Sequence, residues 1–308
     1  MRSGQETIGK VLKATRAAYT VAVNGRRIQC TVRGKLAKKD PSGASVKVGD
    51  DVVVSLVNER EGVIEEILPR KSQLSRVIGS RAYREHIVAV NIDQVLVILS
   101  TKEPPFKSGL LDRYLVIAEK NHLSARVCIN KIDLASPEAF APYRDYYTRI
   151  GYPVHFTSAL TGEGVKALER ALKEKVTALV GHSGVGKSSL IKAIEPELDI
   201  RVGSISQKTH KGQHTTTSVE LFPLSNGGYV IDTPGIRELG LWGIYRKDLQ
   251  EYFVDIRRYA EQCQFADCTH IHEPGCAVIA AAEAGEIFPE RYRNYVNIYH
   301  SLKSASYE

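Results

Sequence analysis

One short run, residues 181–189, constrains the fold of this chain more than any other feature. It reads Gly181-His182-Ser183-Gly184-Val185-Gly186-Lys187-Ser188-Ser189 and matches the pattern GxxxxGK[ST]. Glycines at these spacings let the backbone curl until successive N–H groups point at phosphate oxygens. An apolar strand pattern precedes the run and a helical pattern follows it, and the helix N-terminus adds a favourable field for an anion. Such a strand–loop–helix unit predicts a mostly parallel sheet covered by helices.

Two side chains of this loop have the chemistry that a nucleoside triphosphate requires. Lys187 can reach the β- and γ-phosphates, and the hydroxyl of Ser188 can bind Mg²⁺. Asp232 follows a second predicted strand, 45 residues after Lys187, and begins the run Asp232-Thr233-Pro234-Gly235. There its carboxylate can hold Mg²⁺ through water, and Gly235 lets a backbone N–H approach the γ-phosphate. The two runs together predict magnesium-dependent nucleotide binding.

A third run predicts that the base is guanine. Asn130-Lys131-Ile132-Asp133 follows the predicted strand 126–129 and matches the NKxD arrangement of GTPases. The carboxylate of Asp133 can accept from both N1–H and the exocyclic amine of guanine, a donor pair that adenine lacks. Lys131 can lie along the base, and Asn130 can join the base loop to the phosphate loop. Ser158-Ala159 fits a second base loop, whose backbone N–H would meet the guanine O6.

The order of these runs along the chain is unusual. The base-reading residues precede the phosphate loop, whereas conventional GTPases have them after it. The sequence therefore predicts a circular permutation, which keeps the site because the original chain ends can be joined while new ends open elsewhere. Thr215, Thr216 and Thr217 lie where a GTPase keeps the switch threonine that binds Mg²⁺, and Thr216 is our candidate. The permutation also leads the chain from Asp232–Gly235 straight into the C-terminal region, which could then move as a lever.

The first 69 residues predict a small, basic β-barrel. Short strand patterns at 7–13, 19–23, 26–32, 51–57 and 62–68 fit an OB-fold, with an SH3-like barrel as the alternative. The chain has a net charge of +7, and residues 1–39 hold ten Lys or Arg against one acidic residue. This local excess indicates either a polyanionic partner such as nucleic acid or a well-solvated face.

A cluster of thiols near the C-terminus indicates a metal. Three of the five cysteines, Cys263, Cys268 and Cys276, lie within fourteen residues of one another, and His270 lies between them. Three thiolates and an imidazole suit a closed, structural, tetrahedral zinc site, with buried thiols as the alternative and His272 as the competing imidazole. The sequence has neither an apolar run of membrane-spanning length nor a signal-peptide pattern, so we expect a cytosolic chain without membrane contact.

These residues together resemble the RsgA family of circularly permuted small ribosomal subunit biogenesis GTPases, over nearly the whole chain. The resemblance also rests on further runs: Leu68-Pro69-Arg70-Lys71-Ser72, Leu110-Leu111-Asp112-Arg113-Tyr114-Leu115, Gly212-Gln213-His214-Thr215-Thr216-Thr217, Asp267-Cys268-Thr269-His270 and Glu273-Pro274-Gly275-Cys276. It implies a multidomain α/β protein with an N-terminal OB-fold that binds RNA (1–69), a permuted P-loop GTPase domain (70–244) and a helical zinc domain (245–308). It also implies one zinc ion on Cys263, Cys268, His270 and Cys276, and hence His270 over His272.

The resemblance further implies binding to the small ribosomal subunit and its rRNA late in assembly, with GTP hydrolysis to GDP stimulated by that subunit. Ile236 follows Gly235, where Ras-like GTPases place the glutamine that orients the attacking water. Another group must complete the site, and we expect His214 to do so. The competing hypotheses are a constitutive rRNA-binding scaffold with a vestigial nucleotide site and a metabolic kinase. Nothing in the sequence requires more than a monomer.

Overall fold

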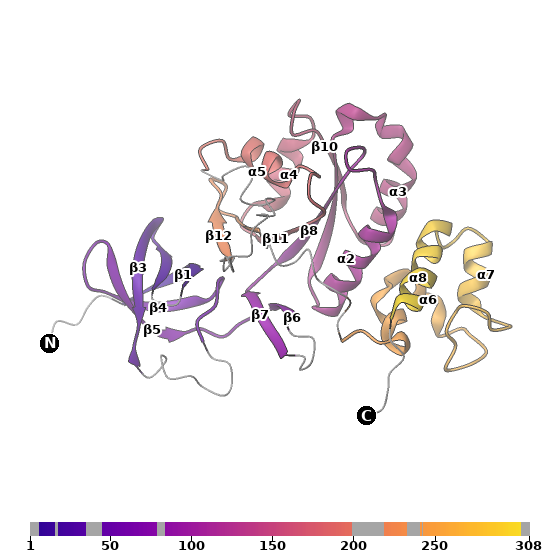
Figure 1. The fold of residues 1–308 in the computed structure, drawn as a ribbon, viewed down its shortest axis with the longest axis horizontal. Helices are drawn as coiled ribbons and strands as arrows, with labels where there is room; N and C mark the ends of the chain where they lie inside the picture. Colours follow the sequence, from indigo (N-terminus) through magenta and orange to yellow (C-terminus); the bar gives the residue numbers. More distant parts are fainter. Residues whose placement is uncertain are drawn as a thin grey trace, which may run out of the picture. The chain divides into compact units, whose positions relative to one another are not determined.

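The computed structural model describes residues 6–15, 18–34, 45–78, 84–198, 219–232, 241 and 243–302 (Figure 1). The chain divides into two compact units, each built from three stretches of sequence. The first comprises Met1–Gln94, Glu169–Leu179 and Asp199–Arg237, and the second Val95–Leu168, Val180–Leu198 and Glu238–Glu308. Within the described segments, none of the helices combines the length and apolarity that crossing a bilayer requires.

Five strands of the first unit form the predicted barrel. They are β1 (Glu6–Ala14), β2 (Tyr19–Val23), β3 (Arg26–Val32), β4 (Asp51–Leu56) and β5 (Glu61–Ile67). Their order is β1-β2-β3-β5-β4, and β1 pairs with β4 to close the ring. The parallel pairing of β3 with β5 is the OB-fold arrangement, which decides against the SH3-like alternative. Alternate side chains such as Val11, Val21, Ile28 and Val54 fill the barrel, as the period of two requires.

The barrel is joined to further strands of the same unit. β13 (Tyr229–Asp232) pairs in parallel with β11 (Val176–Val180) and antiparallel with β12 (Glu220–Pro223), which pairs in turn with β1. A separate hairpin is formed by β6 (Gln73–Ile78) and β7 (Arg84–Val90). The segment between β5 and β6 is held in place by hydrogen bonds from Arg70 and from the backbone of Lys71. Arg70 donates to Asp50 at 2.7 and 2.9 Å, and the Lys71 N–H donates to Asn91 at 2.8 Å.

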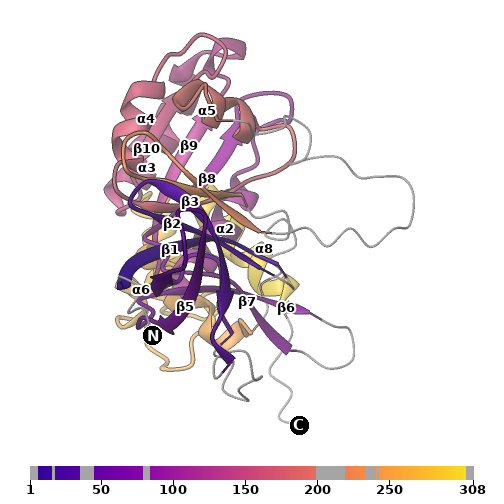
Figure 2. The same ribbon diagram turned by 90° about the vertical axis from the view of Figure 1, so that its left-hand side faces the viewer.

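The second unit has the alternation of strand and helix that the sequence predicts. β8 (Gln94–Ser100), β9 (Ser124–Asn130) and β10 (Val154–Thr157) lie side by side (Figure 2). α2 (Ser108–Lys120) packs on β9, and α3 (Ala141–Arg149) packs on β10. The remaining elements of this region are α4 (Val165–Leu172), α5 (Lys187–Ile194) and the short 3₁₀ turns η1 (Ile132–Leu134) and η2 (Pro137–Phe140).

The C-terminal region of the second unit is helical. It consists of η4 (Arg246–Tyr252), α6 (Val254–Ala260), α7 (Ala277–Glu283) and α8 (Pro289–Ser301). Phe253 breaks the helical run between η4 and α6, because this residue is extended (φ −112°, ψ 94°) and fully buried. Its ring packs with Leu249, Ile256 and Tyr295 in a core that also takes in Val116 of α2. The break therefore follows from tertiary packing that overrides local helix preference.

Candidate functional site

The phosphate loop lies between β11 and α5, as its sequence predicts, and two of its glycines are sterically required. Gly181 has φ +147°, and a Cβ there would lie 2.2 Å from the carbonyl oxygen of Ile98. Gly186 has φ +95°, and a Cβ there would lie 2.3 Å from Nδ2 of Asn130. Any side chain at either position would collide with a neighbouring strand or loop, so glycine is needed for the loop to reach its shape.

Lys187 opens α5 and its ammonium group turns back into the loop. Its Nζ donates to the carbonyl oxygens of Gly181 at 2.8 Å and His182 at 3.0 Å, and the residue is 6% exposed. His182 is itself exposed, and its Nδ1 lies 2.9 Å from the carbonyl oxygen of Ser183. The cation is thus held within the loop, where a phosphate group would be received.

Asn130 joins the base loops to the phosphate loop. It is the last residue of β9 and is buried, and its Nδ2 donates to the carbonyl oxygen of Val185 at 2.8 Å. Its Oδ1 accepts from the hydroxyl of Thr157 at 3.1 Å and from the N–H of Ala159 at 3.3 Å. The side-chain amide of Asn130 therefore joins its own run, 130–133, to the run 158–159 and to the phosphate loop, 181–189, which the sequence assigns to one site.

The residues that follow Asn130 are held by two loops: Asp133 contacts the second base loop, and Lys131 contacts the loop after β8. Asp133 is exposed, and its Oδ1 accepts from the hydroxyl of Ser158 at 2.5 Å. Lys131 has a left-handed backbone (φ +63°), and its Nζ donates to the carbonyl oxygen of Glu103 at 2.5 Å. The hydroxyl of Thr101 donates to the carbonyl oxygen of Lys131, also at 2.5 Å. The loop after β8, which sequence reasoning left out, thus supports the candidate base site.

Asp232 ends β13 and is paired in register with Leu179 of β11, two residues before Gly181. Its backbone therefore lies at the carboxyl end of its strand, where ligands of parallel sheets collect. His214, Thr215, Thr216, Thr217, Gly235 and Ile236 lie outside the described residues. Their assignments remain predictions from sequence.

The four predicted metal ligands come together in the C-terminal region. The ligand atoms of Cys263, Cys268, His270 and Cys276 all lie within 4.8 Å of one another. Nδ1 of His270 is 3.5 Å from Cys263 Sγ and 3.4 Å from Cys276 Sγ, and the two sulfurs are 3.8 Å apart. A tetrahedron with Zn–S bonds of about 2.3 Å and a Zn–N bond of about 2.0 Å has edges of about 3.8 and 3.5 Å. The donor set and the three distances among Cys263, His270 and Cys276 therefore fit zinc.

Hydrogen bonds to one carboxylate hold the shape of the loop that carries His270. His270 has a left-handed backbone (φ +61°), which costs a non-glycine residue about 1 kcal/mol or more. The carboxylate of Glu273 accepts from the N–H groups of Thr269, Ile271 and His272 at 2.9, 3.1 and 3.2 Å, and from the Thr269 hydroxyl. Burial alone would raise the pKa of Glu273, but these hydrogen bonds outweigh it and hold the pKa well below its usual value. His272 is exposed and lies outside the cluster.

Comparisons with known proteins agree with this geometry. The RsgA GTPase family model matches residues 67–242, and the RsgA N-terminal domain model matches residues 8–64. The chain is 43% identical over 303 residues to the small ribosomal subunit biogenesis GTPase RsgA of Gemmatimonas aurantiaca, covering 97% of this chain and 99% of that protein. It is 41% identical to the protein of the same name from Chlorobaculum parvum, covering 96% and 97% of the two chains.

Two solved structures extend the match to three dimensions. YjeQ from Thermotoga maritima superposes with a TM-score of 0.78 at 35% identity, covering 97% of this chain and 99% of that one. YloQ, described as a circularly permuted GTPase, gives a TM-score of 0.75 at 33% identity, covering 97% and 96%. This chain belongs to the RsgA GTPase family.

Membership confirms the predicted fold class and activity. The RsgA-family chain is a multidomain α/β GTP hydrolase with a permuted GTPase domain, an N-terminal five-stranded barrel and a helical C-terminal region whose Cys/His cluster could hold a metal. Mg²⁺ accompanies GTP in this class of enzyme.

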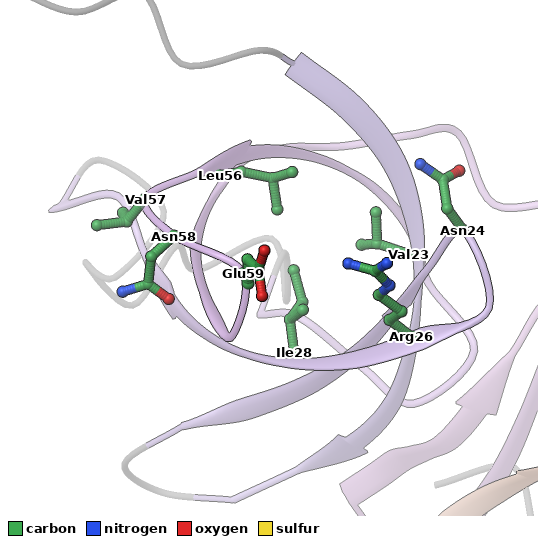
Figure 3. A pocket seen from close by; sticks show the side chains of 8 residues that line it. All are labelled: Val23, Asn24, Arg26, Ile28, Leu56, Val57, Asn58 and Glu59. Carbon is green, nitrogen blue, oxygen red and sulfur yellow. The ribbon is translucent and has the colours of Figure 1, made fainter.

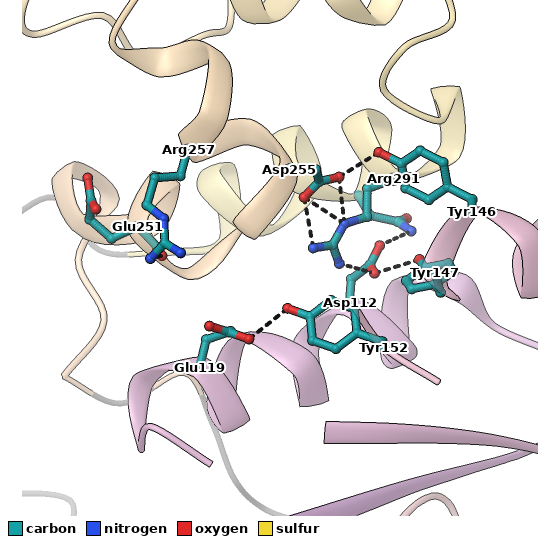
Figure 4. A network of polar contacts seen from close by, with 10 residues as sticks. Asp112, Glu119, Tyr146, Tyr147, Tyr152, Glu251, Asp255, Arg257 and Arg291 are labelled. Atoms are coloured by element: carbon teal, nitrogen blue, oxygen red, sulfur yellow. Dashed lines mark hydrogen bonds and ion pairs between the residues drawn. The ribbon is translucent and has the colours of Figure 1, made fainter. Parts of the chain in front are cut away.

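A buried charge cluster in the RsgA-family chain escaped sequence reasoning. Figure 4 shows the guanidinium group of Arg291, on α8, between two carboxylates. Its Nη1 lies 2.6 Å from Asp112 of α2, and its Nη2 lies 3.0 Å from Asp255 of α6. Tyr147 donates to Asp112 and Tyr146 to Asp255, each at 2.7 Å. The cluster joins the C-terminal helices to the helices that cover β9 and β10.

The open end of the barrel forms a second candidate surface (Figure 3). A hollow of about 610 Å³ lies between the β2–β3 and β4–β5 turns. Its wall is apolar at Val23, Ile28 and Leu56, and it carries the charged side chains of Arg26 and Glu59. Several basic residues of the barrel instead pair with acids, among them Lys10 with Asp51 at 2.6 Å and Lys13 with Glu220 at 2.9 Å. Some of the positive charge of residues 1–39 is therefore neutralised by ion pairs within the fold.

Proposed function

We propose that this RsgA-family GTPase acts in the biogenesis of the small ribosomal subunit, binding the subunit and its rRNA and hydrolysing GTP to GDP in response. The proposal is supported by relatives of that name, which it matches over nearly their full length. The observation that carries it is the Asn130 amide, which joins both base loops to the phosphate loop. A guanine-reading site built in this way supports a working nucleotide switch and counts against a vestigial site.

The residues of the nucleotide site divide by role. Asn130, Lys131 and Asp133, with Ser158 and Ala159, bind guanine, and residues 181–189 bind the phosphates. Lys187 neutralises charge that develops on the γ-phosphate, while Ser188 and Thr216 hold Mg²⁺ with help from Asp232. Gly235 approaches the γ-phosphate, and His214 positions the attacking water in place of the glutamine that Ile236 excludes.

The Cys/His cluster holds one structural zinc ion. Three thiolates and one imidazole leave no position for water, so the ion serves the fold and not the reaction. Burial raises the pKa of the Cys268 thiol to about 12. A bound divalent ion supplies the charge that lets such thiols ionise.

Sedimentation with purified small subunits tests the proposal. The full chain, mixed with small subunits at fixed salt, should pellet with them in the presence of a non-hydrolysable GTP analogue and less so with GDP. Large subunits and bulk RNA of matched mass serve as controls. Equal sedimentation with small and large subunits would contradict the assignment, and nucleotide-independent sedimentation with small subunits would favour the scaffold alternative.

A further inference from the structure

His270 uses its two ring nitrogens in different ways. Nδ1 faces the sulfurs of Cys263 and Cys276 at 3.5 and 3.4 Å. Nε2 points the other way, to Oε1 of Gln250 at 2.6 Å. His270 is 1% exposed, so neither nitrogen is left to bulk water. Gln250 is half-buried and lies on η4, a segment outside the loop that carries the four ligands.

The contact with Gln250 decides which nitrogen carries the proton. An amide oxygen is an acceptor and cannot donate, so Nε2 must donate to it as N–H. A neutral imidazole has one protonated and one bare nitrogen, and the bare nitrogen is then Nδ1. The lone pair needed for a metal bond therefore points at the sulfurs. Outer partners of this kind commonly orient metal-binding histidines and raise their basicity.

We propose that Gln250 is the positioning residue of the metal centre: it holds the proton on Nε2 of His270 and so commits Nδ1 to zinc. The inference rests on the zinc site of the proposed function and adds to it a residue that no ligand motif would identify.

The surrounding contacts keep this arrangement in place. Leu249, next to Gln250, is fully buried in the C-terminal core, which fixes η4. From α8, Tyr292 donates to the carbonyl oxygen of His270 at 2.9 Å, and Tyr295 donates to that of Thr269 at 3.1 Å. With the backbone held from α8 and the ring held from η4, binding through Nε2 would require the ring to turn over and lose its partner.

Nuclear magnetic resonance of the wild-type chain tests the nitrogen assignment directly. The full-length protein is ¹⁵N-labelled on histidine and loaded with one equivalent of zinc, and long-range ¹H–¹⁵N spectra are recorded. We expect His270 to show a protonated Nε2 that exchanges slowly and a metal-bound, unprotonated Nδ1. A metal-bound Nε2 would overturn the inference. Absence of a bound zinc equivalent would instead overturn the zinc assignment and the inference together.

Two substitutions at one position test the role of the acceptor. Gln250→Leu removes the oxygen and should weaken zinc binding by about 10- to 100-fold in competition with a chelator of known affinity. Gln250→Glu keeps an acceptor and should bind zinc at least as tightly as the wild type. Asn297→Leu, on the exposed face of α8, provides a matched control and should leave affinity unchanged. Unaltered affinity in Gln250→Leu, or an equal loss in both Gln250 variants, would refute the role.

Discussion

At the scale of single residues, the buried Asp112–Arg291–Asp255 cluster is the most consequential feature of the C-terminal region. Arg291 and Asp112 are fully buried, and Asp255 is 3% exposed. Burial by itself raises the pKa of Asp255, but the ion pair with Arg291 outweighs it and holds that pKa below its ordinary value. The ring of Phe253 lies under the guanidinium group, 4.3 Å from its central carbon. Removing one member would leave the others charged in a place that water does not reach.

Replacement of Arg291 should therefore strongly destabilise the folded protein. Arg291→Met leaves two buried carboxylates without their cation, and we expect the free energy of unfolding to fall by about 3–5 kcal/mol. Urea denaturation followed by circular dichroism measures this. Arg293→Met, on the exposed side of the same helix, should change stability by less than about 0.5 kcal/mol. A loss below about 1 kcal/mol in the Arg291 variant would show that the cluster is not the junction we describe.

Asp133 gives a prediction about base specificity. Asp133→Asn replaces one acceptor by a donor, so it should weaken GTP binding by on the order of 10²-fold or more. Xanthine carries an oxygen where guanine carries its exocyclic amine, so the same variant should bind xanthosine triphosphate better than the wild type does. Competition against a fluorescent nucleotide measures both effects. Weakened GTP binding without a gain for the xanthine nucleotide would indicate a merely structural role for Asp133.

Sequence reasoning identified residues whose chemistry repeats in a fixed local pattern. Asn130, Asp133 and Lys187 were found in this way, because a nucleotide imposes their spacing. Gln250 and Arg291 were not found. Their partners lie 20 and 179 residues away along the chain, at His270 and Asp112, and no local pattern records such pairings.

At the scale of secondary-structure elements, α8, α2 and the loop of the four metal ligands (residues 263–276, here the metal loop) share one hydrophobic core. Tyr292 and Tyr295 on one side of α8 hold the metal loop, while Arg291 and Asn294 hold Asp112 of α2. A change at the metal loop is therefore carried by α8 to the helix that covers β9.

Removal of zinc should reduce the protection of backbone amides against hydrogen exchange along this path. We expect the backbone amides of α7 and α8 to exchange faster with deuterium after a strong chelator has removed the metal, and those of α2 to follow to a lesser degree. The barrel strands β1–β5 lie in the other compact unit and should exchange at their original rates. Hydrogen-exchange mass spectrometry makes the comparison. Unchanged protection in α8, or equal loss in the barrel, would contradict the shared core.

The barrel gives a prediction about how rRNA binding depends on salt concentration. Arg26 and Arg60 are exposed on its two open-end turns. If each contacts one phosphate of rRNA, then Arg26→Gln and Arg60→Gln should each reduce the slope of log affinity against log salt by about 1. Filter binding with small-subunit rRNA over a salt series measures the slope. Glu59→Gln removes a negative charge beside them and should strengthen binding, whereas unchanged slopes in both arginine variants would place the RNA surface elsewhere.

Most strands and helices could be predicted because the residue patterns that form them are local. The barrel strands begin and end within about one residue of their expected bounds. The break at Phe253 and the strand β6 could not be predicted from local patterns. Phe253 is extended because its ring is needed in a core built from distant residues, and β6 exists through its pairing with β7.

At the scale of the whole molecule, the C-terminal region belongs to one compact unit with the base-reading strands, while β12 and β13 belong to the unit of the barrel. The sequence suggested that the C-terminal region could move as a lever driven from Asp232–Gly235. Its buried attachments, to α2 through Arg291 and to α3 through Tyr146, favour movement together with those helices. The barrel is instead attached to the strand that follows the threonine-rich run, through Lys13 and Glu220.

The most direct test of the central claim is GTP turnover by the purified chain, with and without isolated small ribosomal subunits, at fixed salt. Because Ile236 replaces the water-orienting glutamine, we predict a slow basal rate that small subunits raise by about 10²-fold or more. Lys187→Met should abolish both rates, which excludes a contaminating enzyme. A basal rate that small subunits leave unchanged, although the chain binds them, would contradict the account and point to an RNA-binding scaffold.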